Sequence, residues 1–207
     1  SEEARQKKSR IYDISEDNLN FKEKAGKYID FLNANAYDKE RDVRTNIAGE
    51  FQKSNLAAAL QTAELICGRL DEDKIYEALS QIRISGRMEE IAPGIIVDVS
   101  HNIQGMQGFV QTVEANYHGM KKRILFAASH QNEEEYMKNI LKTIPEIEAF
   151  YTVGIHKRRI NEAEFQDAFR KMIDRNQETT VCFVVGSFYL AGMAKEFINQ
   201  EEENVRL

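Results

Sequence analysis

Three polar side chains that suit ligand chemistry follow one apolar run. Asp98, His101 and Asn102 come directly after Ile95–Val97. Such a run predicts a buried parallel strand, and open α/β sheets bind ligands where the carboxyl ends of their strands open into loops. A carboxylate there accepts hydrogen bonds from ribose hydroxyls or holds a metal through water, and an imidazole or amide binds phosphate or a nucleobase. The residues alone leave a second interpretation open, in which Asp98 caps the next helix and His101 packs at its start.

Two further positions suit the binding of an anion. Arg87 follows Gly86 at a change of composition, and its guanidinium matches the oxygens of a phosphate bidentately. Ser187 follows the apolar run Val181–Val185 and Gly186, so backbone N–H groups at the start of the next helix would face an anion. Each has a plainer interpretation, because a lone arginine is commonly a surface charge and Ser187 would cap the helix.

Other polar residues are predicted at the same sheet edge. Ser129–Gln131 precede a helix whose acidic first turn, Asn132–Glu135, complements the helix dipole. The basic run His156–Arg159 suits an anionic substrate, although a solvated loop is the commoner explanation. No Walker-type loop surrounds Gly26-Lys27, so we expect that this chain does not itself cradle a nucleoside triphosphate in the usual way.

The elements that must position these residues alternate regularly after Pro93. This alternation predicts an α/β fold with a mainly parallel, Rossmann-like sheet and flanking helices. The last residues, which are rich in Glu, are predicted to form a solvated tail. We predict strands at 95–99, 123–127, 147–153 and 180–185, and helices at 105–117, 133–144, 161–175 and 189–199.

The part of the chain before Pro93 has a different pattern. Short apolar pieces up to Ala48 predict short antiparallel strands, and the Ala- and Leu-rich stretch 55–67 predicts a helix capped by Ser54 or Asn55 and stopped by Gly68. A second helix is predicted from Lys74 to Gln81. The change of composition near Ser85 and the turn at Pro93-Gly94 indicate a domain joint. We therefore predict two domains, 1–84 and 85–207.

Composition excludes several classes of protein. The 207 residues are 42% hydrophobic, which is enough to form a core. The net charge of −6 gives no indication of nucleic-acid binding, which is typical of strongly basic proteins. No apolar run is long enough to span a bilayer, and the polar first ten residues are unlike a signal peptide, so we expect no membrane partner. Cys67 and Cys182 lie in apolar contexts, which predicts buried thiols in a reducing cytoplasm.

Four segments in order carry a resemblance to a known family. The chain resembles the folylpolyglutamate synthase and dihydrofolate synthase family, within the Mur-ligase superfamily. The match covers about residues 10 to 200, roughly the second half of the family's chain. The four segments are Ala48–Ala59 against the family's G-x-H-Q-x-x-N-A-A-x-A, Ser85–Glu89 against P-G-R-F-E, Val97–Asn102 against D-G-A-H-N-P, and Val185–Leu190 against G-S-L-Y-L.

The resemblance implies a ligase that joins L-glutamate to a folate with ATP and Mg²⁺, through a phosphorylated carboxylate. It implies that Asn55 approaches the adenine and that Arg87 approaches the phosphates. It implies that Asp98 and His101 face the nucleotide across the domain cleft, with Arg87 and His101 catalytic. It places Ser187 near the incoming glutamate. We also expect Arg87 and Asp98 to be exposed to the cleft, and the protein to be a monomer.

Departures from the family pattern leave alternatives open. Phe51 replaces a histidine, Ile103 replaces a proline, and Asn132-Glu133 stands where the family has Lys-Asp. Because the family's P-loop and metal-site half has no counterpart here, we expect a carboxy-terminal fragment that is inactive alone, with Mg²⁺ bound mainly by the other half. The alternatives are a fragment of a muramyl-peptide-type amino-acid ligase and a degenerate, non-catalytic binding domain.

Overall fold

The structure is a computed structural model that divides into two compact units. The first unit comprises Ser1–Asn46 and Phe51–Ile82, and the second comprises Ile47–Glu50 and Arg83–Leu207. The structure describes residues 6–7, 20–21, 28–33, 41–49, 52–68, 71–156, 159–173 and 179–206.

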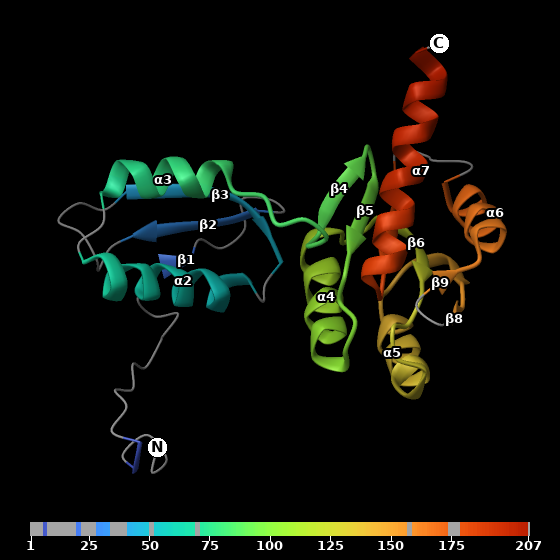
Figure 1. The fold of residues 1–207 in the computed structure, drawn as a ribbon, viewed down its shortest axis with the longest axis horizontal. Coiled ribbons are helices and arrows are strands. Elements are labelled where there is room, and N and C mark those ends of the chain that lie inside the picture. The colour runs from blue at the N-terminus through green and yellow to red at the C-terminus, as the bar shows by residue number, and fades with distance from the viewer. Residues whose placement is uncertain are drawn as a thin grey trace. The chain divides into compact units, whose positions relative to one another are not determined.

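The first unit combines a small sheet with two helices (Figure 1). Its strands lie in the order β1-β2-β3, and β1 is antiparallel to β2. The predicted stop at Gly68 is confirmed, since the first helix ends at Cys67 and Gly68 takes a left-handed φ of 75°. Asp71 caps the next helix by accepting from the Lys74 N–H at 3.4 Å. The elements are β1 (Asn20–Phe21), β2 (Tyr28–Asn33), β3 (Arg41–Ala48), α2 (Gln52–Cys67) and α3 (Glu72–Gln81).

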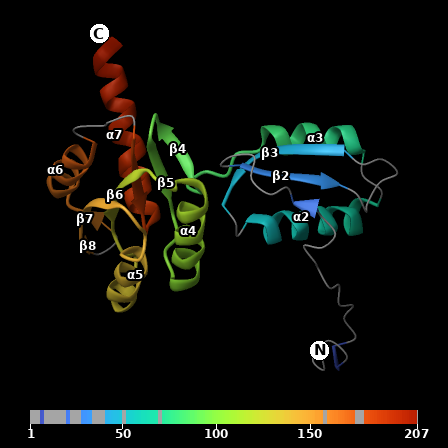
Figure 2. The same cartoon turned by 180° about the vertical axis from the view of Figure 1, so that it is seen from behind.

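The second unit is built on a five-stranded sheet, seen from both sides in Figures 1 and 2. The strand order is β4-β5-β10-β6-β7, in which β4 is antiparallel to β5 and every other neighbouring pair is parallel. The predicted α/β class with a mainly parallel sheet is therefore confirmed. The strands are β4 (Glu89–Ala92), β5 (Ile95–Asp98), β6 (Lys121–Phe126), β7 (Ile147–Thr152) and β10 (Thr180–Val185).

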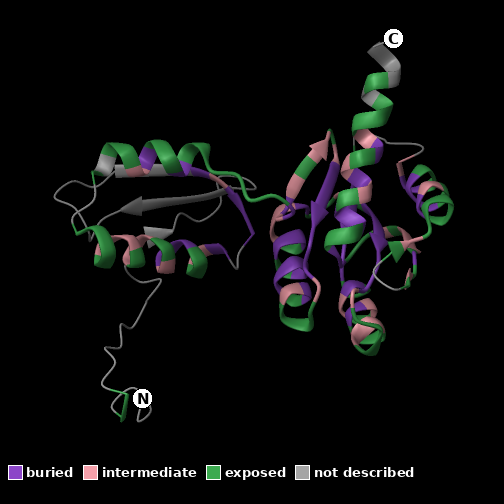
Figure 3. Ribbon diagram, viewed as in Figure 1, coloured by how far each residue is buried: buried purple, intermediate pink, exposed green. Residues whose placement is uncertain are grey.

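Helices cover both faces of this sheet because its central strands are apolar on both sides. All four residues of β5 and all six of β10 are buried (Figure 3). On one face Cys182 and Val184 pack with α6 and α7, and on the other Phe183 contacts Phe109 and Tyr117, which lie at α4 and its C-cap. The helices are α4 (Ile103–Asn116), α5 (Glu134–Leu141), α6 (Glu162–Ile173) and α7 (Phe188–Arg206), and a short hairpin is formed by β8 (Ile155–His156) and β9 (Arg159–Ile160).

Several expectations are corrected. Strand β4 was not predicted because its residues, Glu89–Ala92, include two acids and no apolar run. The Glu-rich end is helical, since α7 continues to Arg206. Cys67 is exposed, whereas Cys182 is buried as predicted, and both thiols are free. Asn55 lies inside α2 rather than at its cap. No helix among the described residues is long and apolar enough to cross a bilayer.

Candidate functional site

The carboxyl ends of four neighbouring strands meet in one row. The parallel register places Asp98 of β5 beside Val185 of β10, Val185 beside Phe126 of β6, and Phe126 beside Thr152 of β7. The polar residues that follow these strand ends therefore lie along one edge of the sheet, where α/β proteins bind ligands.

Asp98 is the buried acid of this edge. Its side chain has no exposed surface, and its two carboxylate oxygens accept the backbone N–H groups of Ser100 at 2.8 Å and Met88 at 3.0 Å. Burial raises the pKa of Asp98, while hydrogen bonds from Ser100 and Met88 and the charge of Arg87 act in the opposite direction without cancelling it. The expectation that Asp98 is exposed to a cleft is wrong, because its neighbours enclose it.

The Met88 contact joins Asp98 to the loop that carries Arg87. Gly86 and Met88 both take left-handed φ angles, 71° and 46°, and a β-carbon on Gly86 would lie 2.7 Å from Val99 Cγ1. The Gly86 carbonyl also accepts the Val99 N–H at 2.8 Å. Only glycine fits its position without strain. The loop therefore holds half-buried Arg87 beside the end of β5.

His101 lies at the same strand end, and one of its ring nitrogens is already hydrogen-bonded. Its Nδ1 is 3.0 Å from the carbonyl oxygen of Val99, so Nδ1 carries the proton and Nε2 of the neutral ring is an acceptor. The ring lies 5.6 Å from that of Phe188, whose side chain is 60% exposed. Asn102 has the helix-capping role, since its Oδ1 accepts the Gly105 N–H at 2.7 Å.

Ser187 begins α7 at the end of β10, and its side chain is also buried. Its Oγ accepts the Leu190 N–H at 3.0 Å, which is a helix N-cap. Gly186 before it has φ 112°, and a β-carbon there would lie 2.5 Å from the carbonyl oxygen of Ala127. Ser129 donates to the Gly186 carbonyl at 3.4 Å and thereby joins the ends of β6 and β10.

The remaining predicted residues lie on other elements. Asn55 lies in the first unit, where its Nδ2 donates to Gln52 Oε1 at 2.8 Å. The basic run falls on the β8–β9 hairpin, and its two middle residues, 157 and 158, lie outside the described residues. No group of three or more His, Cys, Asp or Glu that could hold a metal ion occurs within the described part of the chain.

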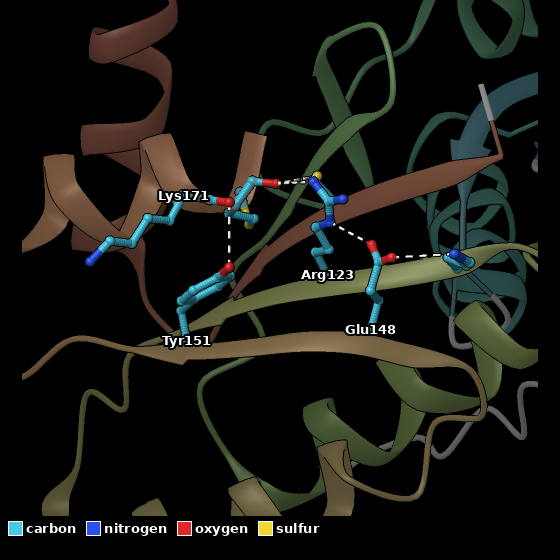
Figure 4. Close-up of polar contacts among 7 residues, drawn as sticks. Arg123, Glu148, Tyr151 and Lys171 are labelled. Atoms are coloured by element: carbon cyan, nitrogen blue, oxygen red, sulfur yellow. Dashed lines mark hydrogen bonds and ion pairs between the residues drawn. The ribbon is translucent and has the colours of Figure 1, made fainter. Parts of the chain in front are cut away.

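The opposite, amino-terminal edge of the sheet carries ion pairs (Figure 4). Glu148 of β7 accepts from Arg123 Nε at 2.8 Å and from Lys121 Nζ at 3.3 Å, and Arg123 also donates to the Met172 carbonyl at 3.0 Å. Lys122, which is fully buried, contacts Glu146 at 2.7 Å. These charges neutralise one another, so the edge offers structural cross-links rather than a site.

A groove of about 770 Å³ lies on α6 and α7. Its charged residues also pair among themselves, Lys171 with Asp167 at 2.6 Å and Arg170 with Glu201 at 3.6 Å. This internal pairing leaves the carboxyl edge as the better candidate, because among the described residues it is there that a buried acid, an arginine and a histidine follow or flank one strand end.

Solved structures share this fold, although no family model and no curated protein matches the sequence. Folylpolyglutamate synthase from Thermotoga maritima matches with a TM-score of 0.69 at 22% identity, over 95% of this chain and 50% of that one. A complex of folylpolyglutamate synthase with AMPPCP and folate matches at 0.73 and 18%, over 95% and 49%. A pseudomurein peptide ligase type C from Methanothermus fervidus matches at 0.64 and 18%, over 88% and 42%.

The chain has the folylpolyglutamate synthase fold. It spans about half the length of the structures it matches. Within this fold, three residues at the carboxyl edge were not singled out from the sequence. Phe188 and Glu89 were quoted only as members of the family segments, and Lys195 was not considered, although Glu89 and Lys195 contact each other at 2.6 Å. Only the fold brings these two residues, 106 positions apart, together.

Proposed function

We propose that this chain forms part of an ATP-dependent ligase that adds L-glutamate to a folate. One arrangement carries the proposal: the Arg87 loop, buried Asp98 and half-buried His101 gather at one sheet edge. Its fold is shared with a folylpolyglutamate synthase that was solved with AMPPCP and folate.

The reaction explains why an arginine is needed at this edge. A carboxylate is a poor electrophile, so transfer of the terminal phosphoryl group of ATP to it gives an acyl phosphate and ADP. The glutamate amine then attacks the carbonyl carbon, phosphate leaves, and the nitrogen loses a proton as the amide forms. The guanidinium of Arg87 would offset negative charge on the phosphates during the first step.

The described residues support direct contact with the nucleotide to different degrees. Nε2 of His101 is an acceptor that suits a hydroxyl or an amino group, and Arg87 suits phosphate oxygens. Asp98 acts through the Met88 N–H, because its side chain has no exposed surface and each of its oxygens already accepts a backbone N–H. The roles of Ser187 beside glutamate and of Asn55 beside adenine stay predictions. The described residues contain no group of three or more His, Cys, Asp or Glu that could hold Mg²⁺.

The decisive experiment expresses the whole reading frame that contains this chain and supplies ATP with labelled glutamate. Dihydropteroate, tetrahydrofolate and a muramyl nucleotide are offered as separate acceptors. We expect incorporation into a pterin-containing acceptor that depends on ATP. Incorporation into the muramyl nucleotide alone would refute the folate assignment.

A substitution tests the arginine within the same assay. We expect Arg87→Ala to lower kcat/KM by roughly 10²- to 10³-fold, because the charge on the phosphates is no longer offset. The matched control is Arg83→Ala, an exposed arginine four positions earlier, which should keep wild-type kinetics. Equal kinetics for the two variants would contradict a role for Arg87.

The match to a pseudomurein peptide ligase supports a second candidate, a ligase that joins an amino acid to a peptide acceptor. The muramyl acceptor in the assay distinguishes it. A third candidate, a non-catalytic binding domain, follows from Asn132-Glu133, which leaves no lysine at that strand end. Absence of incorporation with every acceptor, together with nucleotide binding, would favour it.

A further inference from the structure

The Arg87 loop is held from two directions, and only one of them comes from strand β5. On the β5 side, Asp98 accepts the Met88 N–H at 3.0 Å and the Val99 N–H donates to Gly86 at 2.8 Å. These two contacts fix the backbone on either side of Arg87. They leave the outer side of the loop, at Ser85 and the Gly86 N–H, to other partners.

Those partners are a carboxylate on β4 and an ammonium group on α7. Glu89 Oε2 accepts the Gly86 N–H at 2.5 Å, the Ser85 hydroxyl at 3.2 Å and Lys195 Nζ at 2.6 Å. Lys195 Nζ also donates to Ser85 Oγ at 2.6 Å. Three of these four contacts end on Glu89 Oε2, and Lys195 reaches both Glu89 and Ser85, so Lys195 ties the carboxylate and the outer side of the loop to helix α7.

Electrostatics keeps Glu89 ionised near neutral pH. Burial alone would raise the pKa of Glu89, but the Lys195 ammonium, the Gly86 N–H and the Ser85 hydroxyl outweigh it, and the pKa of this carboxyl lies below its usual value. The Glu89 and Lys195 side chains are 33% and 30% exposed, so the pair contributes little to the stability of the whole unit.

The loop needs such support because its backbone is strained. Met88 has a β-carbon and a φ of 46°, a left-handed conformation whose cost is comparable to what one partly exposed ion pair supplies. Loss of the pair would therefore shift the preferred conformation of the loop without unfolding the sheet. Arg87 moves with the loop.

We propose that Glu89 and Lys195 are positioning residues, which hold the Arg87 loop in its observed conformation from helix α7. What Arg87 then contacts rests on the proposed ligase function. The effect of Glu89 and Lys195 on the conformation of the loop does not rest on that function, because it can be measured without any substrate.

The first test is hydrogen exchange of the chain with Lys195→Met. We expect the Gly86 and Met88 amides to exchange at least tenfold faster, with the amides of β5 and β10 unchanged, and Lys195→Arg to restore protection. The matched control is Lys171→Met, which breaks the exposed Lys171–Asp167 pair on α6 and should leave the loop unchanged. Wild-type exchange at Gly86 in Lys195→Met would overturn the proposal.

The second test asks whether the pair acts through Arg87. In the protein from the whole reading frame, we expect Lys195→Met to lower kcat/KM by about 10- to 100-fold, with recovery in Lys195→Arg. Added to Arg87→Ala, the same change should have no further effect, because the group it positions is gone. Full additivity, or a kcat/KM unchanged by Lys195→Met, would overturn the positioning role. Faster loop exchange in a protein without ligase activity would instead refute only the proposed function.

Discussion

The two edges of the five-stranded sheet both carry buried charge, but they neutralise it differently. At the amino-terminal edge, side chains of opposite sign pair directly, as in Lys122 with Glu146 and Arg123 with Glu148. At the carboxyl edge, two backbone N–H groups and the nearby Arg87 offset the charge of Asp98. The pKa of Glu148 is accordingly lowered, chiefly by the Arg123 hydrogen bond, whereas burial raises that of Asp98.

This contrast shows that a buried charge does not by itself indicate function. A carboxylate that is neutralised by a fixed cation is a cross-link, whereas a carboxylate that organises backbone N–H groups shapes a loop. The second arrangement fixes the loop that presents Arg87. The predictions below separate the two edges, starting with the largest expected effect.

Removing the carboxylate at the carboxyl edge should cost the most. We expect Asp98→Ala to lower the free energy of unfolding by about 2–4 kcal/mol, because two buried N–H groups lose their acceptor. Urea unfolding measures the difference. Asp98→Asn should lose less of the free energy of unfolding, since its amide oxygen still accepts one of the two N–H groups. Wild-type stability in Asp98→Ala would show that the two edges do not differ in this way.

At the amino-terminal edge, the key partner is the one that neutralises a buried lysine. We expect Glu146→Gln to lower the midpoint of thermal unfolding by several degrees, since the Lys122 ammonium is then buried without its carboxylate. Lys122→Met removes that charge and should restore the midpoint when it is added to Glu146→Gln. A double variant less stable than Glu146→Gln would contradict this account.

The pH dependence of stability should have opposite signs at the two edges. Glu148 has a lowered pKa, so it stabilises the folded state above its usual value of 4.5, and this contribution is lost as the pH falls. Asp98 has a raised pKa, so the folded state retains the proton and its contribution is lost as the pH rises above 3.8. In unfolding titrations from pH 3 to 6, Glu148→Gln should flatten the rise of stability with pH, and Asp98→Asn should steepen it. Slopes that change in the same direction would refute the assignment.

The smallest expected effect concerns the two thiols. Burial raises the pKa of Cys182 to about 11, and its Sγ contacts the Met172 carbonyl that also accepts from Arg123. We therefore expect one thiol, the exposed Cys67, to react with a thiol reagent in the folded chain, and two after unfolding. Arg123→Met removes a charge that lowers the Cys182 pKa, so Cys182 should stay unreactive in the folded variant while the Cys67 rate stays constant. Rapid labelling of both thiols in the folded wild type would contradict the buried position.

Sequence patterns predicted the elements of the second unit because hydrophobic periodicity depends on local residues. Apolar runs located β5 and β10, and Ser187 was offered as the cap of the helix after β10, whereas the cap after β5 is Asn102 rather than Asp98. Strand β4 was not predicted because an edge strand with two acids lacks an apolar run. The full length of α7 was not predicted because a run of glutamates is compatible with both a helix and a solvated tail.

The candidate site was predicted in part. The alignment of Asp98 with Val185 follows from parallel strand ends, and the structure confirms that alignment. The burial of Asp98 did not follow, because it depends on Met88, which lies on a different segment. The Glu89–Lys195 contact could not be predicted either, since no local sequence pattern indicates that residues 106 positions apart are in contact.

The β4–β5 hairpin absorbs one extra residue without moving the loop that carries Arg87. Glu89 lies opposite Val97 and Ala92 opposite Ile95, so Ile91 is an extra residue in the ladder. Deletion of Ile91 would give a regular ladder in which Glu89 still lies opposite Val97 and Glu90 opposite Ile96. A change of length on the turn side of the hairpin therefore leaves the start of β4, and with it the height of the guanidinium over the sheet, where it is.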